Sequence, residues 1–254
     1  MSCDPACCAT SVMLPDWPSH NALLGFQALT LNPSQCLRDL DALDALLTGT
    51  VELDERADIL PFFRARPQLS LLLGSYNANM KRFDRLAYEL PLIGFFRPDV
   101  AVGDWQRKRY CFVEFEEAKR DSIFRVTRRR TTEWAPRFQK GYCQVVDWFW
   151  LIESQQDTPQ FEAQFGKRSI QAAGLLVIGR DQAISPTDWH RFEWWRDHVI
   201  VDSRGITCCT YDELARDLRD RLLIALGSSQ ASIVRRRIAA RSARRLPPDL
   251  PRPP

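Results

Sequence analysis

Apolar residues recur at helical spacing in several parts of the chain. Leucines repeat every three or four residues between Leu37 and Leu47, which predicts an amphipathic helix. A later helix is expected to begin with a capping box, with Thr210 as the cap and Glu213 three residues on, and to end at Gly227. The helices predicted from this spacing cover residues 37–47, 52–66, 137–153, 191–198 and 211–226.

Shorter runs of β-branched and aromatic residues predict strands between these helices. They cover residues 85–93, 100–102, 109–115, 174–178, 199–201 and 207–209. A turn around Gly103 and Asp104 joins the second run to the third, which predicts a hairpin. Because strands precede, interleave with and follow helices, the sequence predicts an α/β fold with a mixed central β-sheet flanked by helices.

The strand over 109–115 runs directly into a group of carboxylates. Side chains alternate along a strand, so Tyr110, Phe112, Glu114 and Glu116 share one face, and the apolar residues between them fill the other. Apolar residues on both faces are typical of a strand in the middle of a sheet. Ionised carboxylates beside such a strand need hydrogen bonds or cations to offset their loss of water.

Asp99 lies on the first strand of the predicted hairpin, which could bring it beside Glu114. Together with Glu116 these side chains would form an oxygen-rich pocket, the ligand set that Mg²⁺ or Mn²⁺ prefers. Such a metal would polarise a phosphate and lower the pKa of a bound water. The other interpretation is that the acidic run only marks the exit of the strand to solvent.

Five short motifs extend this picture: "FRPDVAV", "CFVEFEEAK", "KGYCQVVDWFW", "GLLVIGR" and "TYDEL". In order and spacing they resemble the PD-(D/E)XK nuclease superfamily, and more narrowly the Shedu anti-phage defence family, over about residues 50–225. The resemblance implies a restriction-endonuclease-like core, a metal-dependent endonuclease with DNA as the expected substrate, and a homo-oligomer. It places Asp99, Glu114 and Glu116 at the metal site.

The motif departs from the superfamily at one position, because Glu116 stands where the motif has lysine. A substitute cation would come from Lys119 or from Lys140, although an exposed helix lysine is an equally good interpretation of Lys140. Gln144 lies four residues after Lys140, on the same helix face, and resembles the helix glutamine found near the metal in such nucleases.

A basic cluster follows the acidic motif. Its arginines are candidates to contact the phosphates that flank the scissile one, and a solvated surface is the equally weighted alternative. The cluster consists of Arg125, Arg128, Arg129 and Arg130.

Composition and charge set the domain organisation. The 254 residues are 45% hydrophobic and 26% charged, as in soluble globular proteins, and no apolar run is long enough to span a membrane. Residues 228–254 hold seven arginines and one aspartate, which predicts a basic, disordered tail. We therefore expect an N-terminal extension with a helix over 1–50, a nuclease-like domain over 51–227, and the tail.

The eight cysteines include no C-x-x-C pair, and the three histidines are scattered, so neither zinc nor a disulfide framework is indicated. A reducing cytoplasm fits this pattern.

Two other functions stay open. The replacement of lysine by Glu116 favours a catalytically inactive module that binds or senses nucleic acid. The eight tryptophans, some of which could anchor interfaces, leave room for an oligomeric interaction subunit on the same scaffold.

Overall fold

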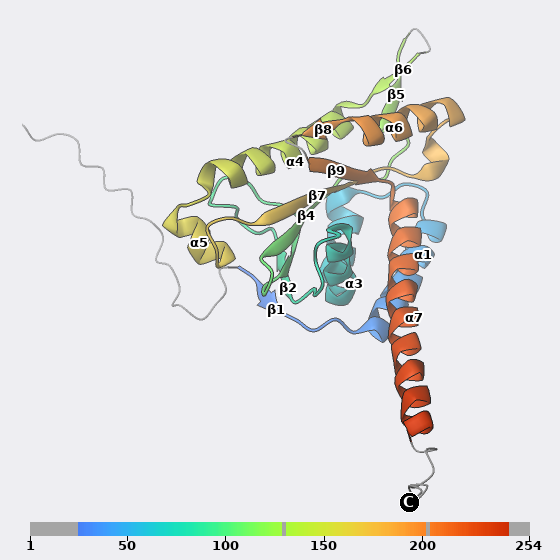
Figure 1. Cartoon of the computed structure of the whole chain (residues 1–254). Coiled ribbons are helices and arrows are strands. Elements are labelled where there is room, and N and C mark those ends of the chain that lie inside the picture. The colour runs from blue at the N-terminus through green and yellow to red at the C-terminus, as the bar shows by residue number, and fades with distance from the viewer. Residues whose placement is uncertain (1–24, 129–130, 202–203, 244–254) are drawn as a thin grey trace, which may run out of the picture.

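The computed structural model describes residues 25–128, 131–201 and 204–243 (Figure 1). Its centre is a seven-stranded sheet with the strand order β1-β2-β3-β4-β7-β9-β8. Three antiparallel pairs join β1 to β4, β4 and β7 are parallel, β7 and β9 are parallel, and β8 closes the far edge antiparallel to β9. The strands are β1 (Gln27–Ala28), β2 (Arg85–Tyr88), β3 (Val100–Asp104), β4 (Arg109–Phe115), β7 (Gln171–Val177), β8 (Ile200–Val201) and β9 (Arg204–Cys209). The predicted mixed α/β sheet is confirmed, and β4 lies in its middle.

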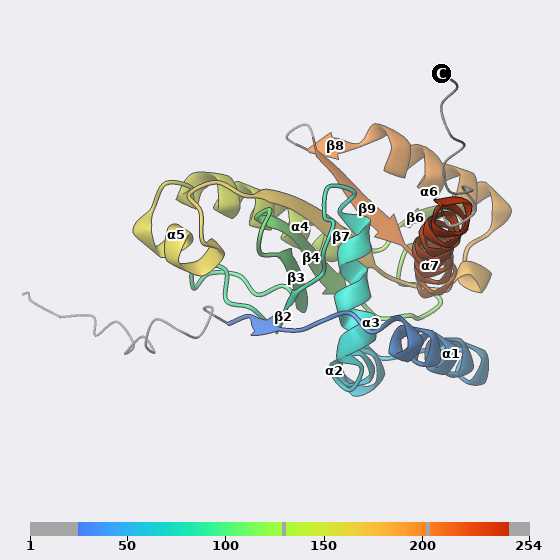
Figure 2. The same ribbon diagram turned by 60° about the horizontal axis from the view of Figure 1, so that its bottom comes forward.

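Helices cover both faces of this sheet (Figures 1 and 2). One face carries α1 (Pro33–Gly49), α2 (Leu60–Arg64), α3 (Pro67–Leu72) and α7 (Tyr211–Ala243). The opposite face carries α4 (Pro136–Gln155), α5 (Pro159–Phe165) and α6 (Pro186–His198). Three short helical turns connect these elements: η1 (Glu55–Ile59), η2 (Leu73–Tyr76) and η3 (Asp181–Ala183).

The alternation of side chains along β4 produces two separate cores. Cys111, Val113 and Phe115 are fully buried with the residues of α1, α3 and α7. Tyr110 and Phe112 are fully buried on the other face, with the residues of α4 and α5. Because both faces of β4 are covered, any polar side chain at its end must emerge between two packed layers.

The predicted hairpin is confirmed, with Val100 opposite Val113 and Asp104 opposite Arg109. Its turn covers residues 105–108 and so follows the predicted position at Gly103 and Asp104, because these two residues still pair with β4. Asp104 is fully buried and accepts hydrogen bonds from the backbone N–H groups of Lys81, Arg82 and Arg107, which explains how a charged residue ends a strand inside the protein.

Several short elements were not predicted, among them β1, α3 and the two described next. The polar stretch after β4 contains a small hairpin, β5 (Phe124–Val126) and β6 (Thr132–Trp134), which forms a sheet of its own. The stretch before β7 contains α5, whose Phe161 and Phe165 are fully buried. Both elements are short, so they show too few turns of a period to be recognised in the sequence.

Helix α7 begins at the predicted capping box but continues beyond its predicted end. Thr210 Oγ1 accepts the N–H of Glu213, and the Glu213 carboxylate accepts the N–H of Thr210. The helix runs through Gly227 to Ala243, so the predicted end at Gly227 is wrong, and the helix enters the segment that was expected to be disordered. A glycine inside a helix costs only about 1 kcal/mol, which the alanine- and arginine-rich sequence that follows can offset.

Residues 244–254 lie outside the described residues, as do residues 1–24, and the domain boundaries stay predictions.

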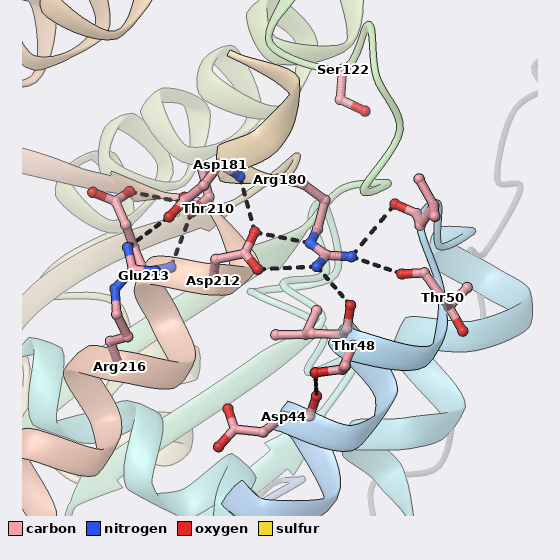
Figure 3. A network of polar contacts seen from close by, with 12 residues as sticks. Asp44, Thr48, Thr50, Ser122, Arg180, Asp181, Thr210, Asp212, Glu213 and Arg216 are labelled. Carbon is pink, nitrogen blue, oxygen red and sulfur yellow. Dashed lines mark hydrogen bonds and ion pairs between the residues drawn. The ribbon is translucent and has the colours of Figure 1, made fainter. Parts of the chain in front are cut away.

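A buried arginine joins the beginning of α7 to the end of α1 (Figure 3). The Arg180 guanidinium donates to both carboxylate oxygens of Asp212, at 2.9 and 3.1 Å. It also donates to the carbonyl oxygens of Leu47 at 2.7 Å and Thr50 at 2.8 Å. Arg180 therefore fixes α1 relative to the first turn of α7.

No helix among the described residues is long and apolar enough to cross a membrane.

Candidate active site

The end of β4 brings together the carboxylates that the sequence singled out. Asp99 immediately precedes β3, and the register that pairs Val100 with Val113 places it opposite Glu114. Its Oδ2 accepts a hydrogen bond of 2.8 Å from the backbone N–H of Phe115. The hairpin alone therefore sets the position of Asp99 relative to Glu114.

Glu114 and Glu116 are almost completely buried, with exposed fractions of 7% and 1%. Oε2 of Glu114 has no hydrogen-bond partner in the described part of the protein. Oε2 of Glu116 lies 3.1 Å from Nη1 of Arg137, an ion pair that lacks hydrogen-bond geometry. A buried carboxylate oxygen without a partner is costly, which points to a role other than stability.

Burial and mutual repulsion shift the pKa values of these groups upwards. Burial, and then the charges of Asp99 and Glu116, raise the pKa of Glu114 to about 10. Burial also raises the pKa of Asp99 to about 7, although the hydrogen bond from Phe115 lowers it. Burial raises the pKa of Glu116 to about 7 against the opposing charge of Arg137. Groups with such shifts near one another are typical of catalytic and ligand sites.

A fourth carboxylate, Glu55, was missed by the sequence analysis. Its charge raises the pKa of Asp99, Glu114 and Glu116. Glu55 is the first residue of η1, and a β-bridge between Leu53 and Ala118 holds this segment beside the end of β4. Because this bridge joins residues far apart in the chain, no spacing in the sequence indicates it.

Arg137, in the first turn of α4, is the cation at the centre of the acidic group. Its guanidinium lies 3.1 Å from Glu116 and 3.6 Å from both Glu55 and Glu117. The side chain is 37% exposed, so it reaches from solvent to the buried carboxylates. Arg137 was not predicted as a site residue either, although it lies one helical turn before Lys140 and so shares its face.

Gly141 allows α4 to approach Glu116 closely. A Cβ atom at this position would lie 3.0 Å from Cγ of Glu116 and 2.9 Å from Cδ1 of Leu176. The glycine of the "KGYCQ" sequence therefore makes room for the Glu116 side chain between the sheet and the helix.

The two candidate lysines differ in their surroundings. Lys119 Nζ lies 2.6 Å from Glu117 and 3.6 Å from Asp54, so its charge is already paired beside the site. Lys140 is exposed on α4, and its charge lowers the pKa of both Glu114 and Glu116. Gln144 is half-buried one turn further along α4.

The basic cluster lies on the β5–β6 hairpin, which projects from the body in Figure 1. Arg125 pairs with Glu133 of the facing strand, with a shortest N–O distance of 2.5 Å. Arg128 is exposed at the end of the hairpin, and Arg129 and Arg130 lie outside the described residues. The chain connects this hairpin to the site at both of its ends, through residues 116–123 after β4 and through the step from β6 into α4.

The carboxylates fit a divalent ion in part. Asp99 and Glu114 offer hard oxygen ligands, and Oε2 of Glu114 has no hydrogen-bond partner among the described residues. Glu116, in contrast, is turned to Arg137. Among the described residues, no group of three His, Cys, Asp or Glu side chains is arranged to hold a metal. The metal site of Asp99, Glu114 and Glu116 stays a prediction, and the hairpin register is what brings Asp99 and Glu114 together.

The central mixed sheet, with helices on both faces and acidic residues at the end of its middle strand, defines an α/β protein compatible with a restriction-endonuclease-like fold. The chain belongs to the Shedu family: the family described as "Shedu protein SduA, C-terminal" matches residues 52–215. This membership associates the protein with anti-phage defence. No curated protein matches the chain.

Proposed function

We propose that this protein is a divalent-metal-dependent endonuclease that cleaves DNA in anti-phage defence. The observation that carries the proposal is the buried Glu114 carboxylate beside Asp99 at the end of the central strand, one oxygen of which has no hydrogen-bond partner within the described part of the chain. A nuclease site explains why a protein would keep such a costly arrangement, because a functional site commonly reduces stability.

The charge balance of the site supports a metal. Four carboxylates converge on this region. Arg137 and Lys140 act on Glu116, Lys140 also acts on Glu114, and Arg64 acts on Asp99. A phosphodiester is itself an anion, so it would be repelled by Asp99 and Glu114 unless a cation stood between them. Asp99 and Glu114 would hold Mg²⁺ or Mn²⁺, which when bound supplies Lewis-acid polarisation of the phosphate and a more acidic water.

The remaining residues have separate tasks in this proposal. Arg137 and Lys140, on one exposed face of α4, would contact the non-bridging oxygens of the scissile phosphate and neutralise developing charge. Arg137 would then exchange part of its contact with Glu116 for the phosphate. Glu116, with a pKa raised to about 7, would be released from this contact and could accept a proton at Oε2.

DNA rather than RNA, and a homo-oligomeric assembly, are parts of the proposal that rest on the family resemblance. The arginines of the β5–β6 hairpin are proposed to contact phosphates beside the cleavage site, because Arg128 is exposed there. The side chain of Arg125 would first have to leave Glu133.

The proposal is tested by incubating the full-length protein with plasmid and linear duplex DNA in Mg²⁺, Mn²⁺ or EDTA. Cleavage is expected with either metal and not with EDTA. Asp99→Ala and Glu114→Ala should abolish it, whereas Asp121→Ala, which removes an exposed carboxylate from the same β4–β5 connection, should not. DNA binding without cleavage under every metal condition would instead support the inactive sensing module.

Two further variants separate the candidate cations. Lys140→Gln should lower kcat more than Lys119→Gln, because the charge of Lys140 acts on Glu114 and Glu116 whereas Lys119 is paired with Glu117 and Asp54. An equal effect of Lys140→Gln and Lys119→Gln on kcat would contradict the assignment to Lys140.

Glu116→Lys restores the lysine of the common superfamily motif. This variant should retain cleavage or change its rate, rather than affect only the solubility of the protein.

A further inference from the structure

The first turn of α7 is bonded to the backbone that carries Glu116. The hydroxyl of Tyr211 donates a hydrogen bond of 2.7 Å to the carbonyl oxygen of Glu116. The ring of Tyr211 is 1% exposed and stacks on Phe115, the last residue of β4, with 6.2 Å between ring centroids. Tyr211 therefore contacts the catalytic strand from the face opposite to Arg137 and α4.

Backbone contacts reinforce this connection. The N–H of Tyr211 donates to the carbonyl of Gly179, and the N–H of Gly179 donates to the carbonyl of Glu117. The N–H of Glu116 in turn donates to Val177 of the neighbouring strand. The chain after β4 thus has its backbone fixed by β7 and by α7.

The first turn of α7 is itself held firmly. The capping box of Thr210 and Glu213 closes the turn, and Asp212 is bound on its other side by Arg180 (Figure 3). A hydroxyl on this turn can therefore act as a fixed reference point for the strand end, because neither its ring nor its backbone is free to follow the strand.

We infer that Tyr211 is a positioning residue of the active site, whose hydroxyl sets the orientation of Glu116 towards Arg137. The inference rests on the proposed nuclease function and extends it to a residue that does not contact the substrate. Glu116 has a narrow space beside Gly141, so a small rotation of its backbone changes the distance between its carboxylate and the Arg137 guanidinium. Misplacement of a reacting group by about 1 Å can reduce a rate about 100-fold.

Tyr211→Phe tests this inference, because it removes the hydroxyl and keeps the stacked ring. Tyr110→Phe is the matched control: Tyr110 is a fully buried tyrosine on β4 whose hydroxyl donates to the carbonyl of Phe165 at 2.9 Å, away from the carboxylates. Both variants lose one buried hydroxyl-to-carbonyl hydrogen bond, so both should lower the Tm by a similar amount. Only Tyr211→Phe should lower kcat for duplex DNA, about tenfold, with KM changed less than about twofold.

Hydrogen exchange followed by mass spectrometry supplies a measurement that does not need cleavage. Peptides that contain the amides of Glu116, Ala118 and Gly179 should exchange faster in Tyr211→Phe than in the native protein, and remain unchanged in Tyr110→Phe. Equal loss of kcat in the two variants, or a Tyr211→Phe protein with native kcat and native exchange in these peptides, would overturn the inference.

The result separates this inference from the proposed function. A native protein that cleaves no DNA in any metal contradicts the proposed function, while the exchange data still decide whether Tyr211 holds the strand end. If Tyr211→Phe does not fold, Thr210→Ala replaces it, because this variant loosens the first turn of α7 and leaves the Tyr211 side chain in place. It should then give the same local increase in exchange and a smaller loss of kcat, and native values for both would contradict the inference.

Discussion

The ionised Glu114 side chain destabilises the folded protein, and the neighbouring carboxylates increase this cost. It is buried at the end of a strand with apolar residues on both faces. One of its oxygens has no hydrogen-bond partner among the residues that the structure describes, and the charges of Asp99 and Glu116 act on it. Each of these circumstances favours the neutral acid over the carboxylate. The folded protein consequently binds a proton at Glu114 more tightly than the unfolded chain does.

We predict that Glu114→Gln stabilises the metal-free protein at pH 8, by about 1–3 kcal/mol, and has little effect at pH 4. The pKa of Glu114 is raised from 4.5 to about 10 on folding, so its contribution to stability is complete below pH 4.5 and is lost as the pH rises towards 10. Glutamine stays neutral and avoids this loss. The Tm of the native protein and of Glu114→Gln, measured from pH 4 to 9 in EDTA, tests the prediction. It would be contradicted if Tm changed with pH equally in the two proteins. Added Mg²⁺ at pH 8 should raise the Tm of the native protein more than that of the variant.

At the scale of the element, α4 contributes several residues of one helix face to the candidate active site. Arg137 is followed at three, four and seven residues by Lys140, Gly141 and Gln144, a spacing that places all four on one side of the helix. Two are cations and one is the glycine against which Glu116 packs. The distance between α4 and β4 therefore decides whether the cations reach the carboxylates.

We predict that Gly141→Ala lowers the free energy of unfolding by about 1 kcal/mol. Alanine improves helix propensity by about 1 kcal/mol, but overpacking against Glu116 and Leu176 costs about 1–3 kcal/mol. Gly227→Ala is the control, since a Cβ there meets nothing within 4 Å, and it should instead stabilise the protein by up to about 1 kcal/mol. Denaturant unfolding of both variants measures their free energies of unfolding. A stabilised Gly141→Ala protein would contradict the prediction and show that α4 and β4 can move apart at little cost.

At the scale of the whole molecule, Arg180 joins segments that lie far apart in the chain. It lies just after β7, binds Asp212 at the beginning of α7, and donates to Leu47 and Thr50 at the end of α1. Arg180 is 6% exposed, so these hydrogen bonds are made largely out of contact with water. This guanidinium joins α1 and α7 on one face of the sheet, together with the apolar core that the two helices share and the ion pairs of Arg219 with Asp41 and Asp44.

We predict that Arg180→Met lowers the free energy of unfolding by about 3–5 kcal/mol. The variant removes the guanidinium from two backbone carbonyl groups and from the Asp212 carboxylate, which would keep the backbone N–H of Asp181 as a donor. Arg216→Met is the matched control: its ion pair with Asp181 is 2.7 Å long, but the arginine side chain is 59% exposed. This control should cost less than about 1 kcal/mol. Similar losses in the two variants, measured by urea unfolding, would show that burial does not distinguish the two pairs.

A final prediction concerns the basic C-terminal segment. Deleting residues 228–254 should leave the Tm of the body unchanged, because the segment is poor in large apolar residues. DNA affinity measured at several salt concentrations decides whether its seven arginines contact phosphates. A contribution from the segment would appear as weaker binding and a flatter salt dependence in the truncated protein, whereas unchanged affinity would remove the segment from the functional proposal.

Local patterns in the sequence were sufficient for part of this description. The alternation along 109–115 predicted the central strand, the turn after Val102 predicted the hairpin that places Asp99 opposite Glu114, and the capping box predicted the beginning of α7. Each of these features depends on residues close together in the chain, because strand alternation, hairpin register and helix caps are set by local geometry.

The tertiary structure alone decided which groups surround these carboxylates. Glu55 arrives through the bridge between Leu53 and Ala118, Arg137 through the packing of α4, and Tyr211 through the parallel pairing of β7 with β9. Short elements such as α5 and the β5–β6 hairpin were also missed, since they complete too few turns of a period. The sequence determined where the acidic strand end lies; contacts between distant segments determined its charge, its positioning and its pKa values, because electrostatic interactions depend on distance in space rather than along the chain.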